Sequence, residues 1–279
     1  MFGKLGFPAL GLAGIGWASA FSFWAMFSAL AIYILSNRTL RQYGIFHQLH
    51  RFEGQIFREL VQTGWPIGVL FLVESGLFTV TTYLMGYLGV DTLAAHQVVL
   101  QTAAVTLMVP VGISYATTVR VGQCLGQQNM LGARMAGYVG ISLGVGFMGL
   151  MAIAFITIPQ PLISLYLDVR ALENATVVAI ASRLFWVAAL FQIFDGCQVI
   201  AGGALRGLKD TQIPMIIGIL AYWCIGLSCG YLMGLQLGYG GVGLWLGLAI
   251  GLAIASVVLT WRFHLLISPL VQQQRVQES

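Results

Sequence analysis

Two acidic residues lie inside long apolar stretches of this sequence, where a carboxylate is unusual. Glu74 lies within the apolar stretch 65–88, and Asp195 lies within the apolar stretch 176–203. Placing such a group at the centre of a membrane helix costs about 2.5–3.5 kcal/mol on insertion scales. A desolvated carboxylate favours its neutral form, so it either holds a proton or needs a cation such as Na⁺ beside it. The pair therefore predicts a shared cation site, with a structural hydrogen bond to a neighbouring helix as the alternative for each residue.

Polar and aromatic residues near the two acids are candidates to complete such a site. Gln192 and Gln198 flank Asp195, while Ser75 and Thr79 follow Glu74. The nearby aromatic residues include Phe71, Phe78 and Phe191. Aromatic walls suit amphipathic cations, so these rings are candidates to line a substrate site.

The composition is that of a membrane protein. Hydrophobic residues make up 58% of the chain and charged residues only 8%, with a mean hydropathy of +0.88. Soluble domains carry roughly 25% charged residues. An all-α bundle follows, because lipid cannot hydrogen-bond to exposed backbone groups. The net charge of +4 is not clustered on one face, so no nucleic-acid partner is expected.

Seven stretches are long enough to cross a bilayer core about 30 Å thick. They cover roughly residues 9–35, 65–88, 93–118, 134–158, 176–203, 212–236 and 240–264. Most of the Lys and Arg residues fall in the loops on one side of this pattern, and that side is expected to be cytoplasmic. We therefore expect a multi-pass protein of the cell (inner) membrane with a cytoplasmic C-terminus.

Two short motifs match enzyme patterns in the wrong context. Residues 144–149 match GxGxxG and residues 226–230 match GxSxG, but both lie inside apolar stretches without a preceding strand. Close helix packing explains them better, as it does the ladder Gly226, Gly230, Gly234 and Gly238. The four cysteines form no CxxC pair. We expect neither an enzyme nor a bound cofactor.

Several segments occur in the order and spacing of one family's signatures. They are residues 94–97 (AAHQ), 108–114 (MVPVGIS), 120–126 (RVGQCLG), 191–196 (FQIFDG) and 203–211 (GALRGLKDT), followed by Pro214. In these segments the chain resembles the multidrug and toxic compound extrusion family, specifically its NorM-like branch. The resemblance implies a two-lobe transporter, with six helices in each lobe, that exchanges Na⁺ or H⁺ for amphipathic, often cationic drugs.

The resemblance also implies roles for individual residues. Glu74 matches the acidic cation-site residue of the family's seventh helix, and Asp195 matches that of the tenth. Both would bind Na⁺ if transport is sodium-coupled. Phe191 stands where some members carry a tyrosine, and Ser19 matches a hydroxyl residue of the sixth helix.

Against the family pattern, the chain resembles the sixth helix plus the complete C-terminal lobe. Residues 1–36 would be the last helix of the N-terminal lobe and 37–64 a cytoplasmic linker between lobes. Residues 65–268 would form the six-helix C-terminal lobe and 269–279 a cytoplasmic tail. Residues 8–17 echo residues 239–247, as expected for equivalent helices of two repeats. We therefore expect an N-terminally truncated portion of a transporter, with the missing lobe as a partner.

Three alternatives stay open. A lipid-linked oligosaccharide flippase of the same superfamily would need a cationic cavity for pyrophosphate, and Arg183 is the candidate cation within a span. An intramembrane hydrolase using Glu74 and Asp195 as an acid/base pair would need a nucleophile or metal ligands, and no HExxH motif occurs. The third alternative is a lobe that does not transport.

Overall fold

The computed structural model describes residues 11–37 and 53–278, and the chain divides into two compact units, residues 1–58 and 59–279. The first unit contains α1 (Gly11–Ser36), whose segment Gly16–Ser36 is long and apolar enough to cross a membrane. The predicted first span is therefore confirmed as a helix. Residues 1–10 and residues 38–52 of the predicted linker lie outside the described residues.

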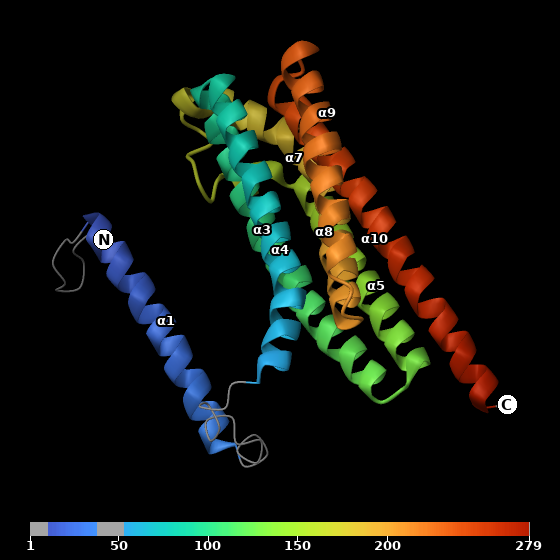
Figure 1. Cartoon of the computed structure of the whole chain (residues 1–279). Coiled ribbons are helices and arrows are strands. Elements are labelled where there is room, and N and C mark those ends of the chain that lie inside the picture. Colours follow the sequence, from blue (N-terminus) through green and yellow to red (C-terminus); the bar gives the residue numbers. More distant parts are fainter. Residues whose placement is uncertain (1–10, 38–52, 279) are drawn as a thin grey trace. The chain divides into compact units, whose positions relative to one another are not determined.

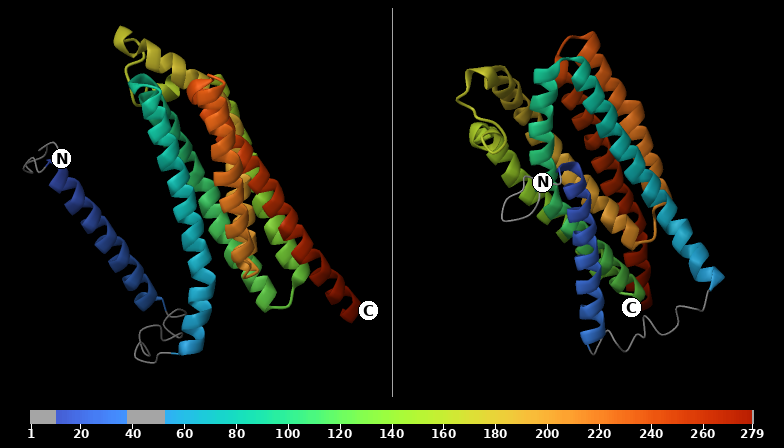
Figure 2. Two further views of the ribbon diagram at one scale, coloured as in Figure 1. Left: turned by 45° about the horizontal axis from the view of Figure 1, so that its top comes forward. Right: turned by 90° about the vertical axis from the view of Figure 1, so that its left-hand side faces the viewer.

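The second unit is a bundle of long helices, shown in Figures 1 and 2. Its long helices are α3 (Gly54–Tyr87), α4 (Val90–Gly126), α5 (Met130–Thr157), α7 (Ala175–Gly207) and α10 (Gly240–Glu278). The shorter segments are α6 (Pro159–Ile163), η1 (Leu172–Asn174), α8 (Gln212–Ile219), η2 (Leu220–Leu227), α9 (Ser228–Tyr231) and η3 (Leu232–Gln236). With α1, seven helical segments of the described chain can span a membrane, which confirms the predicted number.

The breaks between helices follow from local chemistry. Gly89 precedes α4 with a φ of 125°, a conformation that other residues rarely adopt. The side chain of Asn129 caps α5 by accepting a hydrogen bond of 2.8 Å from the Gly132 amide. Gly238 and Gly240 also have positive φ, and they make the turn into α10. The end of the predicted linker, from Gly54 onward, is helical and continues without a break into the span as α3.

Helix α7 forms the centre of the bundle, packed against α4, α5 and α10. Small residues allow this close approach. A side chain at Gly144 of α5 would collide with Ile200 of α7, and one at Gly203 would collide with Ser114 of α4. The GxGxxG match therefore contains a helix-packing position, as the sequence predicted.

The glycine ladder packs the segment 212–236 against α10. The backbone of Gly230 lies against Gly247, and that of Gly226 lies against Gly251. Part of this segment is π-helical, over Leu220–Leu227 and Leu232–Gln236. Gly238 differs from the prediction, because it lies in the turn with a φ of 76°, and a Cβ added there would meet no atom within 4 Å.

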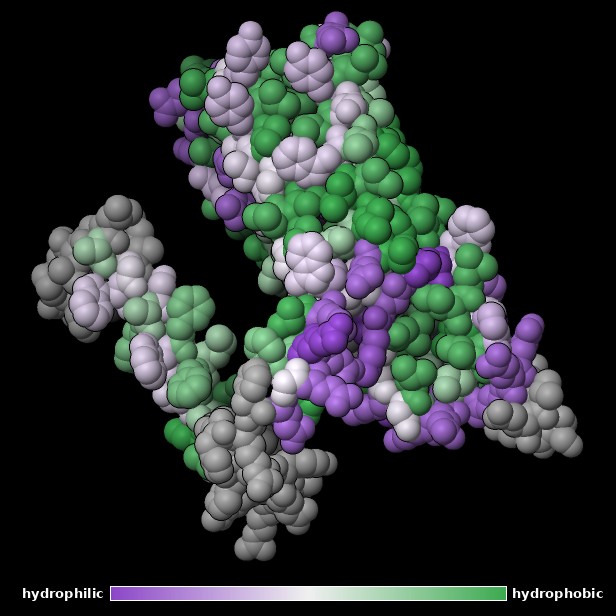
Figure 3. Space-filling model, viewed as in Figure 1, coloured by the Kyte–Doolittle hydropathy of each residue, from purple (hydrophilic) through white to green (hydrophobic). Residues whose placement is uncertain are grey.

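Charged side chains gather at the end of the bundle where α3 begins and α7 ends. Lys209 pairs with Glu59, and Arg262 pairs with Asp210, each at 2.5 Å. Hydrophilic side chains are visible at this end, below a predominantly apolar middle section (Figure 3). This distribution suits a bundle whose polar end meets the membrane surface.

Candidate functional site

Two helices direct stripes of side chains toward one another. On α7 the stripe contains Asp195, Gln198, Gly202 and Arg206, at spacings of three and four residues. Such spacing places residues on one face of a helix. The facing stripe of α3 contains Glu74. Acidic and basic groups on different helices therefore face a common space.

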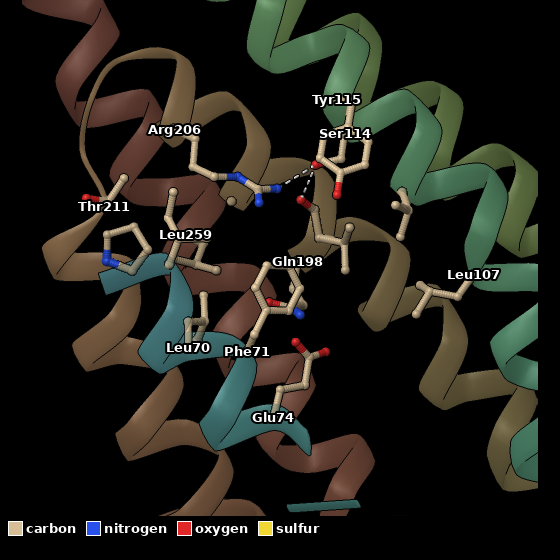
Figure 4. A pocket seen from close by; sticks show the side chains of 15 residues that line it. Leu70, Phe71, Glu74, Leu107, Ser114, Tyr115, Gln198, Arg206, Thr211 and Leu259 are labelled. Atoms are coloured by element: carbon tan, nitrogen blue, oxygen red, sulfur yellow. Dashed lines mark hydrogen bonds between the residues drawn. The ribbon is translucent and has the colours of Figure 1, made fainter. Parts of the chain in front are cut away.

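That space is a cavity of about 140 Å³. Its polar lining groups come from Glu74, Ser114, Tyr115, Gln198, Arg206 and Thr211, and its walls from Ile67, Leu70, Phe71, Leu107, Val111, Val199, Gly202, Pro214 and Leu259. Figure 4 shows the carboxyl of Glu74, the amide of Gln198 and the guanidinium of Arg206 in this one cavity. The cavity is thus mainly apolar, with a few polar groups, as small-molecule sites usually are.

Arg206 is held at one side of the cavity by a serine. Its Nη2 donates a hydrogen bond of 2.9 Å to Ser114 Oγ, which donates its own hydrogen to the Val199 carbonyl at 2.8 Å. Within the described part of the chain, no carboxylate lies within ion-pair distance of Arg206. Because a guanidinium stays protonated in proteins, Arg206 brings a permanent positive charge to the cavity.

Asp195 lies one helical turn from Gln198 and is almost fully buried, with 4% of its surface exposed. Its Oδ1 has no hydrogen-bond partner among the described residues. The carboxyl also lies within electrostatic range of Glu74. Buried oxygens are rarely left unpaired, so this atom fits a site for a proton or a small cation.

Gln192 is a second buried group with an unused atom. Its Oε1 accepts a hydrogen bond of 3.1 Å from Thr106, whereas its Nε2 has no partner among the described residues. Gln192 does not line the cavity, but it shares the buried face of α7 with Asp195. The two buried polar atoms without a hydrogen-bond partner among the described residues, Gln192 Nε2 and Asp195 Oδ1, therefore lie on one segment of α7.

Aromatic rings close the region next to Asp195. Phe191 packs edge-on against Phe78, with ring centroids 6.3 Å apart, and against Trp245 at 5.1 Å. Phe191 has no hydroxyl group, so it packs against this cluster and cannot serve as an oxygen ligand. Trp245 also donates a hydrogen bond of 3.1 Å to Nδ1 of the fully buried His96.

The bonding of His96 indicates a structural role. Its Nδ1 accepts from Trp245, so in the neutral ring the proton is on Nε2, which lies 3.0 Å from Thr82 Oγ1. His96 thereby connects α4 to α3 and α10, and it does not line the cavity.

The predicted site residues are brought together in part. Glu74, Phe71 and Gln198 line the cavity, and Asp195, Phe191, Phe78 and Gln192 lie in the neighbouring interior. Ser75 and Thr79 are exposed on α3, where Thr79 Oγ1 donates to the Ser75 carbonyl. Ser19 belongs to α1 of the first unit, and its part in an ion site stays a prediction.

Sequence reasoning missed Arg206, Ser114 and Tyr115. Arg206 follows the apolar stretch 176–203 in the sequence, which favours a loop position, and the predicted cation within a span is Arg183. In the structure α7 continues to Gly207, Arg206 faces the cavity, and Arg183 is exposed. The spacing of three and four residues from Asp195 to Arg206 places both on one face of a helix, and this pattern could have identified Arg206.

Fold and composition define a multi-pass helical membrane protein. The MatE family model matches residues 66–232, and the chain belongs to this family. It is 45% identical over 263 residues to a "Probable multidrug resistance protein NorM" of Synechocystis sp., covering 94% of this chain and 57% of that protein. It is 41% identical over 273 residues to a "Multidrug resistance protein NorM" of Burkholderia vietnamiensis, covering 98% of this chain and 58% of that protein.

Solved structures show the same fold at low sequence identity. An outward-facing multidrug resistance MATE family transporter of the MOP superfamily superposes with a TM-score of 0.72 at 15% identity, over 81% of this chain and 50% of that one. The crystal structure of MATE in the bent conformation gives 0.71 at 15% identity, over 80% and 48%. The chain therefore spans about half the length of these structures, and less than two thirds of the curated relatives it matches.

Proposed function

We propose that this chain is the ion-coupling portion of a cation-driven antiporter that exports amphipathic or cationic compounds. One observation carries the proposal. Asp195 is buried with one oxygen unpaired among the described residues, and it lies one helical turn from Gln198. Gln198 and Glu74 both line the cavity. The names of the relatives support multidrug resistance as the activity to test.

The coupling step follows from charge. When both carboxyls are ionised, their repulsion in a desolvated interior favours uptake of a cation, either Na⁺ or H⁺. Oxygens of Glu74, Asp195 and the Gln198 side chain are the groups that would hold it. A cationic substrate that approaches the same carboxyls would compete with the bound ion. Export is then linked to entry of the ion.

Arg206 would limit how much positive charge the site accepts. With Glu74 and Asp195 ionised and Arg206 protonated, the formal charge of the three groups is −1. One monovalent cation then neutralises them. We propose that this balance favours one coupling cation per cycle and keeps its binding weak enough for release.

The flippase alternative gains less support. Arg206 does bring a cation to the cavity, as that alternative requires, but Glu74 lines the same cavity and offsets its charge. A pyrophosphate carries several negative charges and would need an excess of cationic groups. The antiporter therefore fits the lining better. We further propose that a six-helix N-terminal lobe supplies the opposite wall of the substrate cavity.

Dye efflux from cells tests this function. The protein would be expressed from its complete gene, and export of a cationic fluorescent dye would be followed after an imposed ion gradient. Glu74→Gln and Asp195→Asn should each reduce efflux at least tenfold while the protein stays inserted in the membrane. Asp91→Asn removes an exposed carboxylate and should leave efflux unchanged. Normal efflux by both site variants would refute the proposal.

A further inference from the structure

A second concave site lies on the bundle, away from the acidic pair. It is a groove of about 550 Å³ formed by α5, α7 and α10. Helix α7 contributes Phe194 and Cys197 to this groove, whereas Gln198, Gly202 and Arg206 of the same helix line the cavity. The groove is therefore a separate feature, and its properties do not depend on the proposed antiport.

The groove is mainly apolar, and two side chains that can form hydrogen bonds to a ligand lie at one end of it. Tyr138 and His264 line it where α5 begins and α10 approaches the charged end of the bundle. Val145 of α5 and Val257 of α10 line it farther along the span. From Tyr138 to Val145 the helix rises about 10 Å at 1.5 Å per residue. This distance is about a third of a hydrocarbon core about 30 Å thick, long enough to hold part of an acyl chain.

The polar end offers a positive charge and a hydrogen-bond donor. The guanidinium of Arg134 lies 5.8 Å from the centre of the Tyr138 ring. In the described part of the chain, Arg134 has no acidic partner, whereas Arg262 is paired with Asp210. Arg134 therefore places an unpaired cation beside Tyr138, where it is available to an anion.

Tyr138 and His264 share a hydrogen bond of 2.6 Å between Oη and Nδ1. If Tyr138 donates, the neutral ring carries its proton on Nε2, which lies 3.5 Å from Ser268 Oγ. If Nδ1 carries the proton, it donates to Oη, and the tyrosine hydroxyl hydrogen is then free to donate elsewhere. In the second arrangement the Tyr138 hydroxyl is a donor for a ligand, whereas in the first the Nε2 proton is shared with Ser268. Tyr138 is half-buried and His264 is exposed, so a ligand can reach the pair.

We propose that this groove binds an anionic phospholipid of the surrounding leaflet. Its phosphate would lie against Arg134, Tyr138 and His264, and an acyl chain would lie along Val145, Phe194 and Val257. The apolar lining of the groove and the unpaired arginine beside Tyr138 match this ligand. A lipid without net charge has a compensating cation in its headgroup and gains less from Arg134.

The test measures lipid binding to the purified protein in detergent. The protein is titrated with phosphatidylglycerol or with phosphatidylcholine of identical acyl chains, and bound lipid is counted by native mass spectrometry. The wild-type protein should bind phosphatidylglycerol about fivefold more tightly, as expected for one basic residue near a membrane surface. Arg134→Gln should remove this preference, and Arg134→Lys should retain it.

Two matched controls separate the site from general effects. Arg120→Gln removes an exposed arginine near the same end of the bundle, outside the groove, and should keep the preference. Val257→Trp fills the apolar part and should weaken binding of both lipids, whereas Leu150→Trp, on an exposed face of α5, should not. Thermal unfolding midpoints confirm that each variant is folded.

Three results would overturn the proposal. The first is equal binding of the two lipids by the wild-type protein. The second is an unchanged preference in the folded Arg134→Gln variant. The third is displacement of bound phosphatidylglycerol by inorganic phosphate alone at similar concentration, because the groove would then bind a free anion and not a lipid.

Discussion

Within the cavity, Glu74 and Arg206 bring opposite charges into one small, mainly apolar volume. Arg206 has a fixed hydrogen-bond partner there, Ser114. A change at Arg206 alters the charge without touching either carboxyl. A substitution at Arg206 therefore tests directly how its positive charge affects cation binding by the carboxyls.

Arg206→Gln should tighten binding of the coupling cation and slow its release. Loss of the positive charge removes the repulsion between Arg206 and the bound cation. At an effective dielectric constant of about 20 this repulsion is roughly 1–2 kcal/mol, which corresponds to about tenfold in cation affinity. Titration of the purified protein with the cation, followed by tryptophan fluorescence, measures the change.

Two variants control for structural effects of that substitution. Arg206→Lys keeps the charge and should retain wild-type affinity. Ser114→Ala removes the hydrogen-bond partner but leaves the charge, so its effect should appear in the unfolding midpoint and not in cation affinity. An unchanged cation affinity in Arg206→Gln would show that the arginine does not influence the ion site.

At this scale the sequence revealed the acids but not the arginine. Glu74 and Asp195 could be predicted because a charged group surrounded by apolar sequence is conspicuous. Arg206 lies where an apolar stretch gives way to polar residues, and there sequence cannot tell a loop cation from one facing inward. The partner hydroxyl of Ser114 lies on another helix, so only the packing of α4 against α7 brings it to Arg206.

At the scale of elements, contact between backbones holds the segment 212–236 against α10. A Cβ added to Gly247 would collide with the backbone of Gly230. Backbone atoms cannot rotate away as a flexible side chain can. The contact therefore depends on the absence of side chains at both positions.

Gly247→Ala should lower the free energy of unfolding by about 1–3 kcal/mol, the usual cost of overpacking. Gly146→Ala is the matched control, because a Cβ there meets open space and alanine favours helix by up to about 1 kcal/mol. Thermal unfolding in detergent compares the two variants. Equal midpoints would contradict the backbone contact.

The glycine ladder shows what sequence can say about packing. Regular spacing predicted that Gly226, Gly230 and Gly234 form a packing face, and they lie against α10. Spacing did not separate them from Gly238, which continues the pattern but lies in a turn. The π-helical segments could not be predicted either, because their hydrogen bonding depends on fit to a neighbour.

At the scale of the whole molecule, the seven spans could be predicted because length and hydropathy decide them. The helix ends were predicted less well. Helices α3, α4 and α10 all continue beyond their apolar stretches with polar residues, which hydropathy does not assign to a span. The side of the membrane that each turn faces stays a prediction from the distribution of basic residues.

Cysteine labelling in intact cells tests that orientation. In a background in which Cys124, Cys197, Cys224 and Cys229 are replaced, Gln127→Cys in the turn between α4 and α5 should be protected from a membrane-impermeant maleimide. Tyr239→Cys in the turn before α10 should react. Basic residues flank the first turn and not the second, so the positive-inside rule places the first turn in the cytoplasm. The reverse labelling pattern would contradict the predicted orientation.

The most direct measurement of the central claim is release of the coupling ion when substrate binds. The purified protein, expressed from its complete gene, is mixed with a cationic dye in weak buffer, and released protons and ²²Na⁺ are both recorded. We predict that the wild-type protein and the control Glu173→Gln release one of these ions, whereas Glu74→Gln and Asp195→Asn release neither. Release by the two site variants equal to that of the wild-type protein would show that the acidic pair does not bind the coupling ion.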